Sequence, residues 1–151
     1  MLHAIIEAVA QPRIEAIERA LDTAPGLLDM LPRLMRLAAN LAQYSPMPKI
    51  AKILIGEGNQ FPTLLQEYRS RVIDRLLVAL TRLIERARQQ GEIVVTDPGL
   101  AARLIVAPVV FCVPWQISLG QHPQARMDIP ALPELHGQML NRALSCKEPS
   151  Q

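Results

Sequence analysis

The stretch FPTLLQEYRSRVIDRLLVALTRLIERARQQG, residues 61–91, decides the fold of this chain. Its apolar residues recur every three or four positions, and they are Leu65, Tyr68, Val72, Leu76, Leu80, Leu83 and Ala87. This spacing puts them on one side of an α-helix, while arginine and acidic residues occupy the other sides. Pro62 suits a first helical turn and Gly91 suits a helix end. The sequence therefore predicts one long helix over about residues 61–90.

Helical periodicity also fills the part of the chain before this segment. Residues 2–21 predict a first helix, which Pro12 is expected to bend because proline removes a backbone donor. Residues 27–42 are apolar on nearly every side and predict a buried helix. Residues 48–55 predict a short helix between two turns. Three helices are thus expected before the long one.

Two more helices are expected after the long one. Residues 92–96 could form a strand, but an isolated strand has no partner, so an extended linker is expected there. Residues 97–119 begin with Asp-Pro, a typical helix start, and are almost wholly apolar. Pro108 and Pro114 are expected to kink or split this helix. Residues 132–144 predict a last amphipathic helix.

The composition fits one soluble all-α domain of about six helices. The chain has 151 residues, of which half are hydrophobic and 3% aromatic, so aliphatic residues must fill a single core. Residues 1–145 are expected to form this domain, with a frayed tail at 146–151. The longest apolar run, residues 104–115, is about twelve residues long, whereas a membrane span needs about twenty. A cytoplasmic location without a membrane anchor is therefore expected.

Charge and reactive residues argue against several functional classes. Sixteen basic and fourteen acidic residues are scattered along the chain, with no basic run typical of a nucleic-acid arm. The three histidines lie far apart, so no metal site is expected. Cys112 lies among apolar neighbours, as an inert core thiol does. No catalytic residue and no cofactor site is evident, and an enzyme is not expected.

The helix at residues 97–119 has more apolar surface than one small subunit is expected to cover. It could be the central helix of a monomeric bundle. We favour the alternative, in which one side packs inward and another contacts a second subunit. Trp115 near its end is a large amphipathic ring of the kind found in interfaces and pocket walls.

Three stretches occur in an order that is similar to a known family. They are GNQFPTLLQEY at 58–68, LIERARQQGEI at 83–93 and TDPGLAARLI at 96–105. Together they resemble the C-terminal regulatory domain of tetracycline-repressor (TetR) type transcription regulators. The resemblance extends from the first helix to about Leu144. It implies a bundle of about six helices that senses a small hydrophobic effector, forms a homodimer through its last two helices, and passes the signal to DNA only through an upstream helix-turn-helix domain.

In that family the helix-turn-helix precedes the equivalent of residues 2–10, and it is not found in these 151 residues. The resemblance implies that ligand binding moves the first helix and so changes the separation of two DNA-binding heads. The alternative is a helical adaptor that binds a partner protein and has no cavity.

Position in these helices gives two sets of expected site residues. The expected ligand pocket is lined by Met30, Leu34, Met35, Ala38, Tyr44, Leu54, Tyr68, Val72, Phe111 and Trp115. The expected dimer interface consists of Leu104, Ile105, Val109, Val113, Leu135, Met139 and Ala143.

Overall fold

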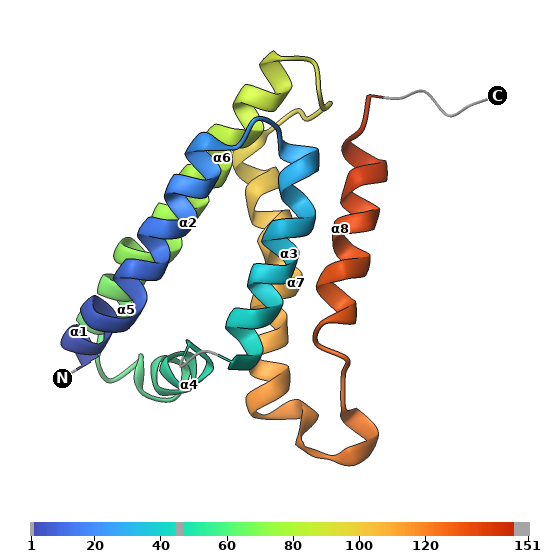
Figure 1. Ribbon diagram of the computed structural model, residues 1–151. Coiled ribbons are helices and arrows are strands. Elements are labelled where there is room, and N and C mark those ends of the chain that lie inside the picture. The colour runs from blue at the N-terminus through green and yellow to red at the C-terminus, as the bar shows by residue number, and fades with distance from the viewer. Residues whose placement is uncertain (1, 45–46, 147–151) are drawn as a thin grey trace.

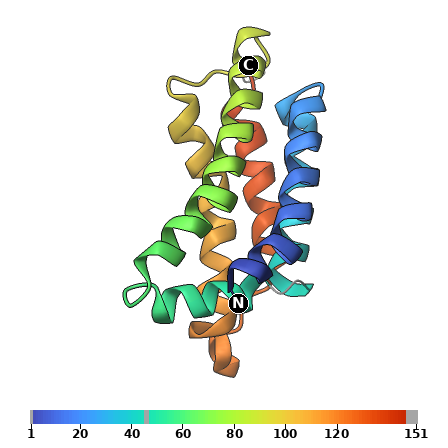
Figure 2. The ribbon, with the colours of Figure 1, turned by 90° about the vertical axis from the view of Figure 1, so that its left-hand side faces the viewer.

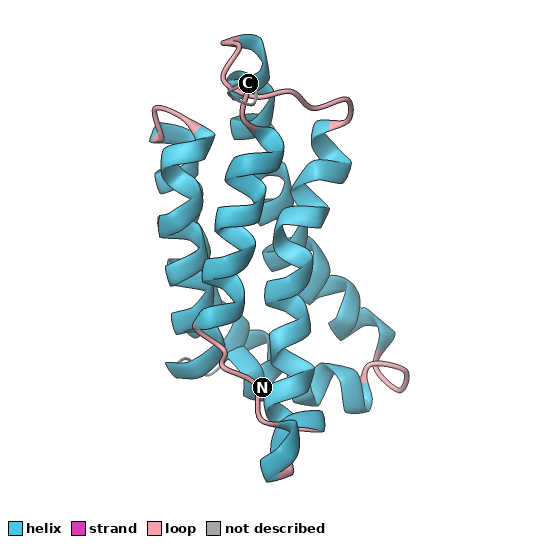
Figure 3. Cartoon of the chain, turned by 90° about the vertical axis from the view of Figure 1, so that its right-hand side faces the viewer, coloured by secondary structure: helices cyan, strands magenta, loops and turns pink. Residues whose placement is uncertain are grey.

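The computed structural model describes residues 2–44 and 47–146, and the regular elements of these residues are helical (Figure 3). The expected all-α fold is therefore confirmed. The α-helices are α1 (Leu2–Ile5), α2 (Gln11–Thr23), α3 (Leu27–Tyr44), α4 (Met47–Glu57), α5 (Pro62–Tyr68), α6 (Asp74–Gln89), α7 (Pro98–Ile117) and α8 (Ala131–Leu144). The π-helical turns are η1 (Ile6–Ala10) and η2 (Arg69–Ile73), and the 3-10 turns are η3 (Leu119–Gln121) and η4 (Pro123–Ala125).

The long helices run side by side, and α4 lies across one end of them (Figures 1 and 2). Helix α6 packs between α2 and α7, and α3 contacts both α7 and α8. The apolar stripes of α2, α3, α6 and α7 meet in one core, because each can leave water only by facing the others. Leu27, Leu31, Leu83, Ile84 and Ile105 are almost fully buried there.

Two of the expected helices contain a π-helical turn, which is wider than an α-helical one. Turn η1 lies just before Pro12, where the sequence predicted a bend. Turn η2 interrupts the long helix, where the sequence gave no warning. Ile6, Ala10 and Ile14 pack against Val72 of η2, so the two irregular turns face each other across the α2–α6 contact.

Ion pairs join the N-terminal helix to the long helix beside these turns. The Glu7 carboxylate accepts a hydrogen bond from Arg71 at 2.9 Å, and this bond lowers the pKa of Glu7. Arg71 also pairs with Glu67 at 3.2 Å, and His3 contacts both carboxylates. The sequence places arginine and acidic residues on the outer sides of the long helix, where pairs within the helix can form. The structure has those, and it adds links between the first and the long helix.

Helix α7 begins as the sequence predicted. The Asp97 side chain accepts a hydrogen bond from the Leu100 backbone N–H at 3.0 Å, and Pro98 occupies the first turn. The helix continues unbroken through Pro108 and Pro114, so of the two expected outcomes, a kink or a split, the split does not occur. By length and composition it is also the one helix of the described residues that could cross a membrane. Only 17% of its most apolar 18-residue stretch is buried in this structure.

The segment after α7 folds back on it through two 3-10 turns. The Trp115 indole N–H donates a hydrogen bond to the Ala125 carbonyl at 2.6 Å. Buried Cys112 and Ile129 form a small apolar cluster beneath these turns. Residues 92–96 form neither a helix nor a strand, and Ile93 makes an isolated antiparallel bridge to Ser145 after α8.

Candidate ligand cavity

A cavity of about 250 Å³, half open to solvent, lies between α2, α3, α6 and α7 and is bounded also by the two π-helical turns. From the N-terminal and long helices its wall includes Ala10, Arg13, Ile14, Ile17, Leu21, Tyr68, Val72, Ile73, Leu76, Leu77 and Leu80. From the remaining helices it includes Leu34, Met35, Leu37, Ala38, Leu41, Ala51, Ile105, Val106, Val109, Val110 and Val113. This space is about half open to solvent and largely apolar, and an apolar lining is typical of small-molecule sites.

The cavity wall is almost free of polar groups. Arg13 and Tyr68 are the two lining residues with polar side chains. Arg13 is exposed and donates to the Val9 carbonyl at 2.7 Å, so its charge stays near solvent. Burial raises the pKa of the Tyr68 phenol above its ordinary value, at which a phenol is already neutral near pH 7. The cavity thus offers a ligand one neutral hydroxyl and many aliphatic contacts, and a buried charge would find no counter-ion inside.

Half of the expected pocket residues line this cavity. They are Leu34, Met35, Ala38, Tyr68 and Val72. Met30 and Leu54 are buried elsewhere in the core, and the side chain of Tyr44 lies outside the described residues. Phe111 is half exposed, and its ring packs on Trp115, 5.5 Å away. Trp115 in turn holds the segment after α7, so neither ring reaches the cavity.

The orientation of α7 about its own axis explains why Phe111 and Trp115 do not line the cavity. Ile105, Val109 and Val113 follow each other at intervals of four residues and face the cavity. Phe111 and Trp115 lie off that line. Ile14 and Ile17 of α2 also line the cavity, although they are not among the expected pocket residues.

The expected interface residues also fall into two groups, one exposed and one lining the cavity. Leu104, Leu135, Met139 and Ala143 are exposed on α7 and α8. Ile105 is only 2% exposed, and with Val109 and Val113 it borders the cavity of its own subunit. The exposed apolar face of α7 is formed by Leu100, Leu104 and Phe111, and Val110, which lines the cavity, is also exposed.

The cavity also touches both π-helical turns. Ala10 comes from η1, and Val72 and Ile73 come from η2. π-Helical turns often mark functional sites because they add one residue to a helical turn and can relax. A molecule in this cavity would contact both places where the helices depart from regular geometry.

Comparison with known proteins identifies the family and the fold. The sequence profile of the AefR-like transcriptional repressor C-terminal domain matches residues 29–128, two thirds of the chain. The fold is similar to the 1.54 Å crystal structure of a protein described as a TetR-family transcriptional regulator from Mesorhizobium loti MAFF303099. That match has a TM-score of 0.71 and 18% identity, and covers 95% of this chain and 71% of the other. No curated protein matches the sequence. The chain therefore belongs to the TetR family of transcriptional regulators, in its group of AefR-like repressor C-terminal domains.

Proposed function

We propose that this domain senses a small, neutral, apolar effector in the cavity and passes the signal to DNA through a domain outside residues 1–151. The family is one of transcriptional regulators and not of enzymes, which gives the domain a regulatory role. The observation that supports effector sensing is the half-open cavity of about 250 Å³ with its aliphatic wall. The proposed location is the cytoplasm, where a transcriptional regulator acts.

A change in the first helix is the proposed output. Turn η1 contacts the cavity through Ala10 and is tied to the long helix by the Glu7–Arg71 pair. A ligand that fills the space beside Val72 would favour one packing of η1 on η2 over another. The ligand can shift this equilibrium only by the difference between its affinities for the two packings.

A homodimer is part of this proposal. Leu100, Leu104 and Phe111 on α7 and Leu135 and Met139 on α8 each leave 47% to 67% of their surface exposed. Pairing these faces with their two-fold copies would cover them. A partner-binding adaptor would use the same faces, but it would need no internal cavity, so we favour the sensor.

Binding of the neutral fluorophore N-phenyl-1-naphthylamine tests the sensing role. We expect saturable fluorescence enhancement with the wild-type protein, because the dye leaves water for an aliphatic cavity. Ala38→Trp, which fills the cavity, should abolish the enhancement, and the smaller Ala38→Met should weaken it. Ala16→Trp is the matched control, since Ala16 is exposed on α2 and does not line the cavity.

The proposal fails if the wild-type protein gives no saturable enhancement. It also fails if Ala38→Met and Ala38→Trp, both folded by circular dichroism, bind the dye as the wild type does.

A further inference from the structure

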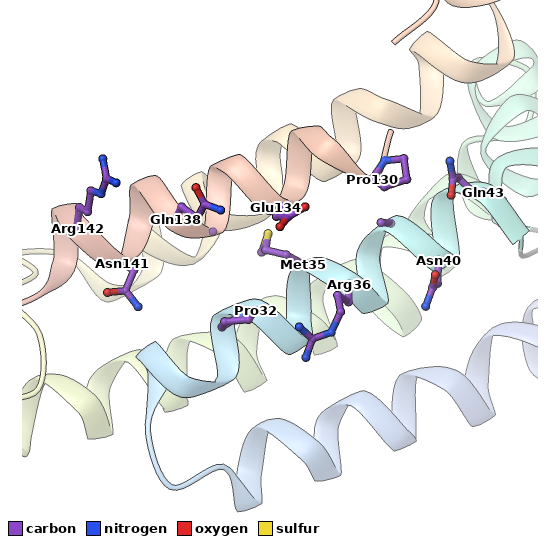
Figure 4. A pocket seen from close by; sticks show the side chains of 12 residues that line it. Pro32, Met35, Arg36, Asn40, Gln43, Pro130, Glu134, Gln138, Asn141 and Arg142 are labelled. Atoms are coloured by element: carbon purple, nitrogen blue, oxygen red, sulfur yellow. The ribbon is translucent and has the colours of Figure 1, made fainter. Parts of the chain in front are cut away.

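A second hollow lies on the surface, between α3 and α8 (Figure 4). Its volume is about 630 Å³, within the range of roughly 300–1,000 Å³ found for small-molecule sites. The two helices run antiparallel here, with Pro32 near Asn141 and Gln43 near Pro130. We call this hollow the α3–α8 groove.

The floor of the groove is apolar and its edges are polar. Met35, Ala39 and Gly137 are buried at the floor. The polar side chains along the edges are Arg36, Asn40, Gln43, Glu134, Gln138, Asn141 and Arg142. Figure 4 shows Met35 and Asn141 between the helices, with Arg36 and Arg142 at opposite edges. The groove thus differs from the inner cavity, whose wall is aliphatic.

These edge side chains have no partner among the described residues. None of the seven makes a side-chain hydrogen bond or an ion pair there. On the long helix, by contrast, Arg71, Arg75 and Arg82 each pair with a carboxylate of the first helix. The groove therefore keeps two guanidinium groups and four amides available for a ligand.

The chemistry of the edges specifies the ligand. Two arginines and one glutamate give the groove a net charge of +1, which one carboxylate balances and a doubly charged phosphate would exceed. Guanidinium groups bind carboxylates through paired N–H donors. Asparagine and glutamine each donate and accept, as an amide in the ligand does. We propose that the α3–α8 groove is a second ligand site, which takes a small monocarboxylic acid that carries amide groups.

Met35 connects this second site to the inner cavity, because it lines both. It is also held closely from the groove side: a Cβ on Gly137 would lie 3.0 Å from the Met35 Cγ. The unbranched thioether of methionine adapts its shape easily. A ligand on the groove floor would therefore press Met35 toward the cavity, and occupancy of one site would change the affinity of the other by an equal factor in both directions.

Calorimetric titration with N-acetyl-glycyl-glycine tests the site. This probe has one carboxylate and two amides, and its neutral counterpart is N-acetyl-glycyl-glycinamide. We expect the acid to saturate the protein and the neutral amide to bind about tenfold more weakly, because a hydrogen bond to a charged group is lost. Because the two arginines lie at opposite edges, one carboxylate pairs with one of them, so either Arg36→Gln or Arg142→Gln, and not both, should weaken acid binding about fivefold to tenfold. Arg33→Gln is the matched control, because Arg33 is an exposed residue of α3 that does not line the groove.

The site proposal is overturned if the acid does not saturate by about 20 mM. It is also overturned if the neutral amide binds equally well, or if neither Arg36→Gln nor Arg142→Gln weakens binding more than Arg33→Gln does. Gly137→Ala adds a methyl group to the groove floor, and acid binding unchanged in this variant would place the probe elsewhere.

The coupling between the groove and the inner cavity is measured in a separate experiment. The dissociation constant of N-phenyl-1-naphthylamine should change at least about threefold when the acid is saturating, and the acid constant should change by the same factor when the dye is saturating. Acid binding with no change in dye affinity would support the second site but refute the role of Met35 in coupling the two sites. Acid binding by a protein that does not bind the dye would refute the proposed function of the inner cavity and keep the groove.

Discussion

Glu92 holds the start of α3 from a position 65 residues away in the sequence. Its carboxylate accepts hydrogen bonds from the Leu27 and Leu28 backbone N–H groups, at 3.1 and 2.8 Å. These two donors belong to the first turn of α3, where no helical partner exists. Gly26 lies directly beneath this carboxylate, since a Cβ there would be 2.9 Å from both Glu92 oxygens. The contact therefore joins the α2–α3 turn to the segment after α6.

Glu92→Ala should lower the free energy of unfolding by about 1–2 kcal/mol, because it removes the cap of α3 and leaves two part-buried donors without their acceptor. Urea unfolding followed by circular dichroism measures this loss. Glu57→Ala is the control, because Glu57 is an exposed glutamate near a helix end. Equal stability of the two variants would contradict a capping role for Glu92.

Glu92 and Asp97 both cap a helix, but only the Asp97 cap can be predicted from the sequence. Asp97 caps the helix that follows it immediately, so the Asp-Pro pattern was sufficient to predict α7. The cap of α3 depends on a contact between distant segments, and no local pattern predicts that contact. The same limit applies to the cavity wall. Leu34 and Ala38 were predicted from the apolar stripe of α3, whereas Ile105 and Val109 face inward because of how α7 packs.

At the scale of elements, α7 shows why an apolar pattern can be uninformative. The helix is apolar on every side, so its periodicity does not distinguish the side that faces the core from the side that faces outward. The π-helical turn η2 was also outside the reach of sequence reasoning. Its residues continue the helical apolar stripe, so no break in the pattern marks the wider turn. In the structure this turn packs through Val72 against η1.

In the segment between α7 and α8, the hydrogen bond from the Trp115 indole to the Ala125 carbonyl joins residue 125 back to α7. Trp115→Phe keeps an aromatic ring but removes the indole N–H. We expect a loss of about 1 kcal/mol in unfolding free energy and faster amide exchange at residues 125–129. Hydrogen exchange with mass spectrometry measures the second effect.

Phe111→Leu provides the comparison for this variant. It removes the ring contact with Trp115 but keeps the indole hydrogen bond, so exchange at residues 125–129 should stay near the wild-type rate. Faster exchange in both variants would show that ring packing, and not the hydrogen bond, holds this segment.

At the scale of the whole molecule, the fold leaves its most apolar helix poorly covered. Leu100 and Leu104 on α7 and Met139 on α8 are 58% to 67% exposed, although the core of the same subunit is well packed. Single exposed apolar residues are ordinary, but several on adjacent helices indicate an interaction surface. The sequence predicted this surplus from composition, and the structure supplies the residues that carry it.

The proposed dimer follows from this surface and gives the last prediction. A stable homodimer interface buries about 2,000 Å² or more and is apolar at its centre. A carboxylate placed there would be buried near its own two-fold copy, which is costly because the two like charges lose solvent together. Leu104→Glu and Met139→Glu should therefore each convert the protein to monomers at micromolar concentration, as measured by sedimentation velocity. Leu65→Glu, which places the same charge at a half-exposed position on α5, should remain dimeric. A monomeric wild type would refute the dimer itself, whereas a dimer disrupted by Leu65→Glu and kept in the other two variants would move the interface to the long helix.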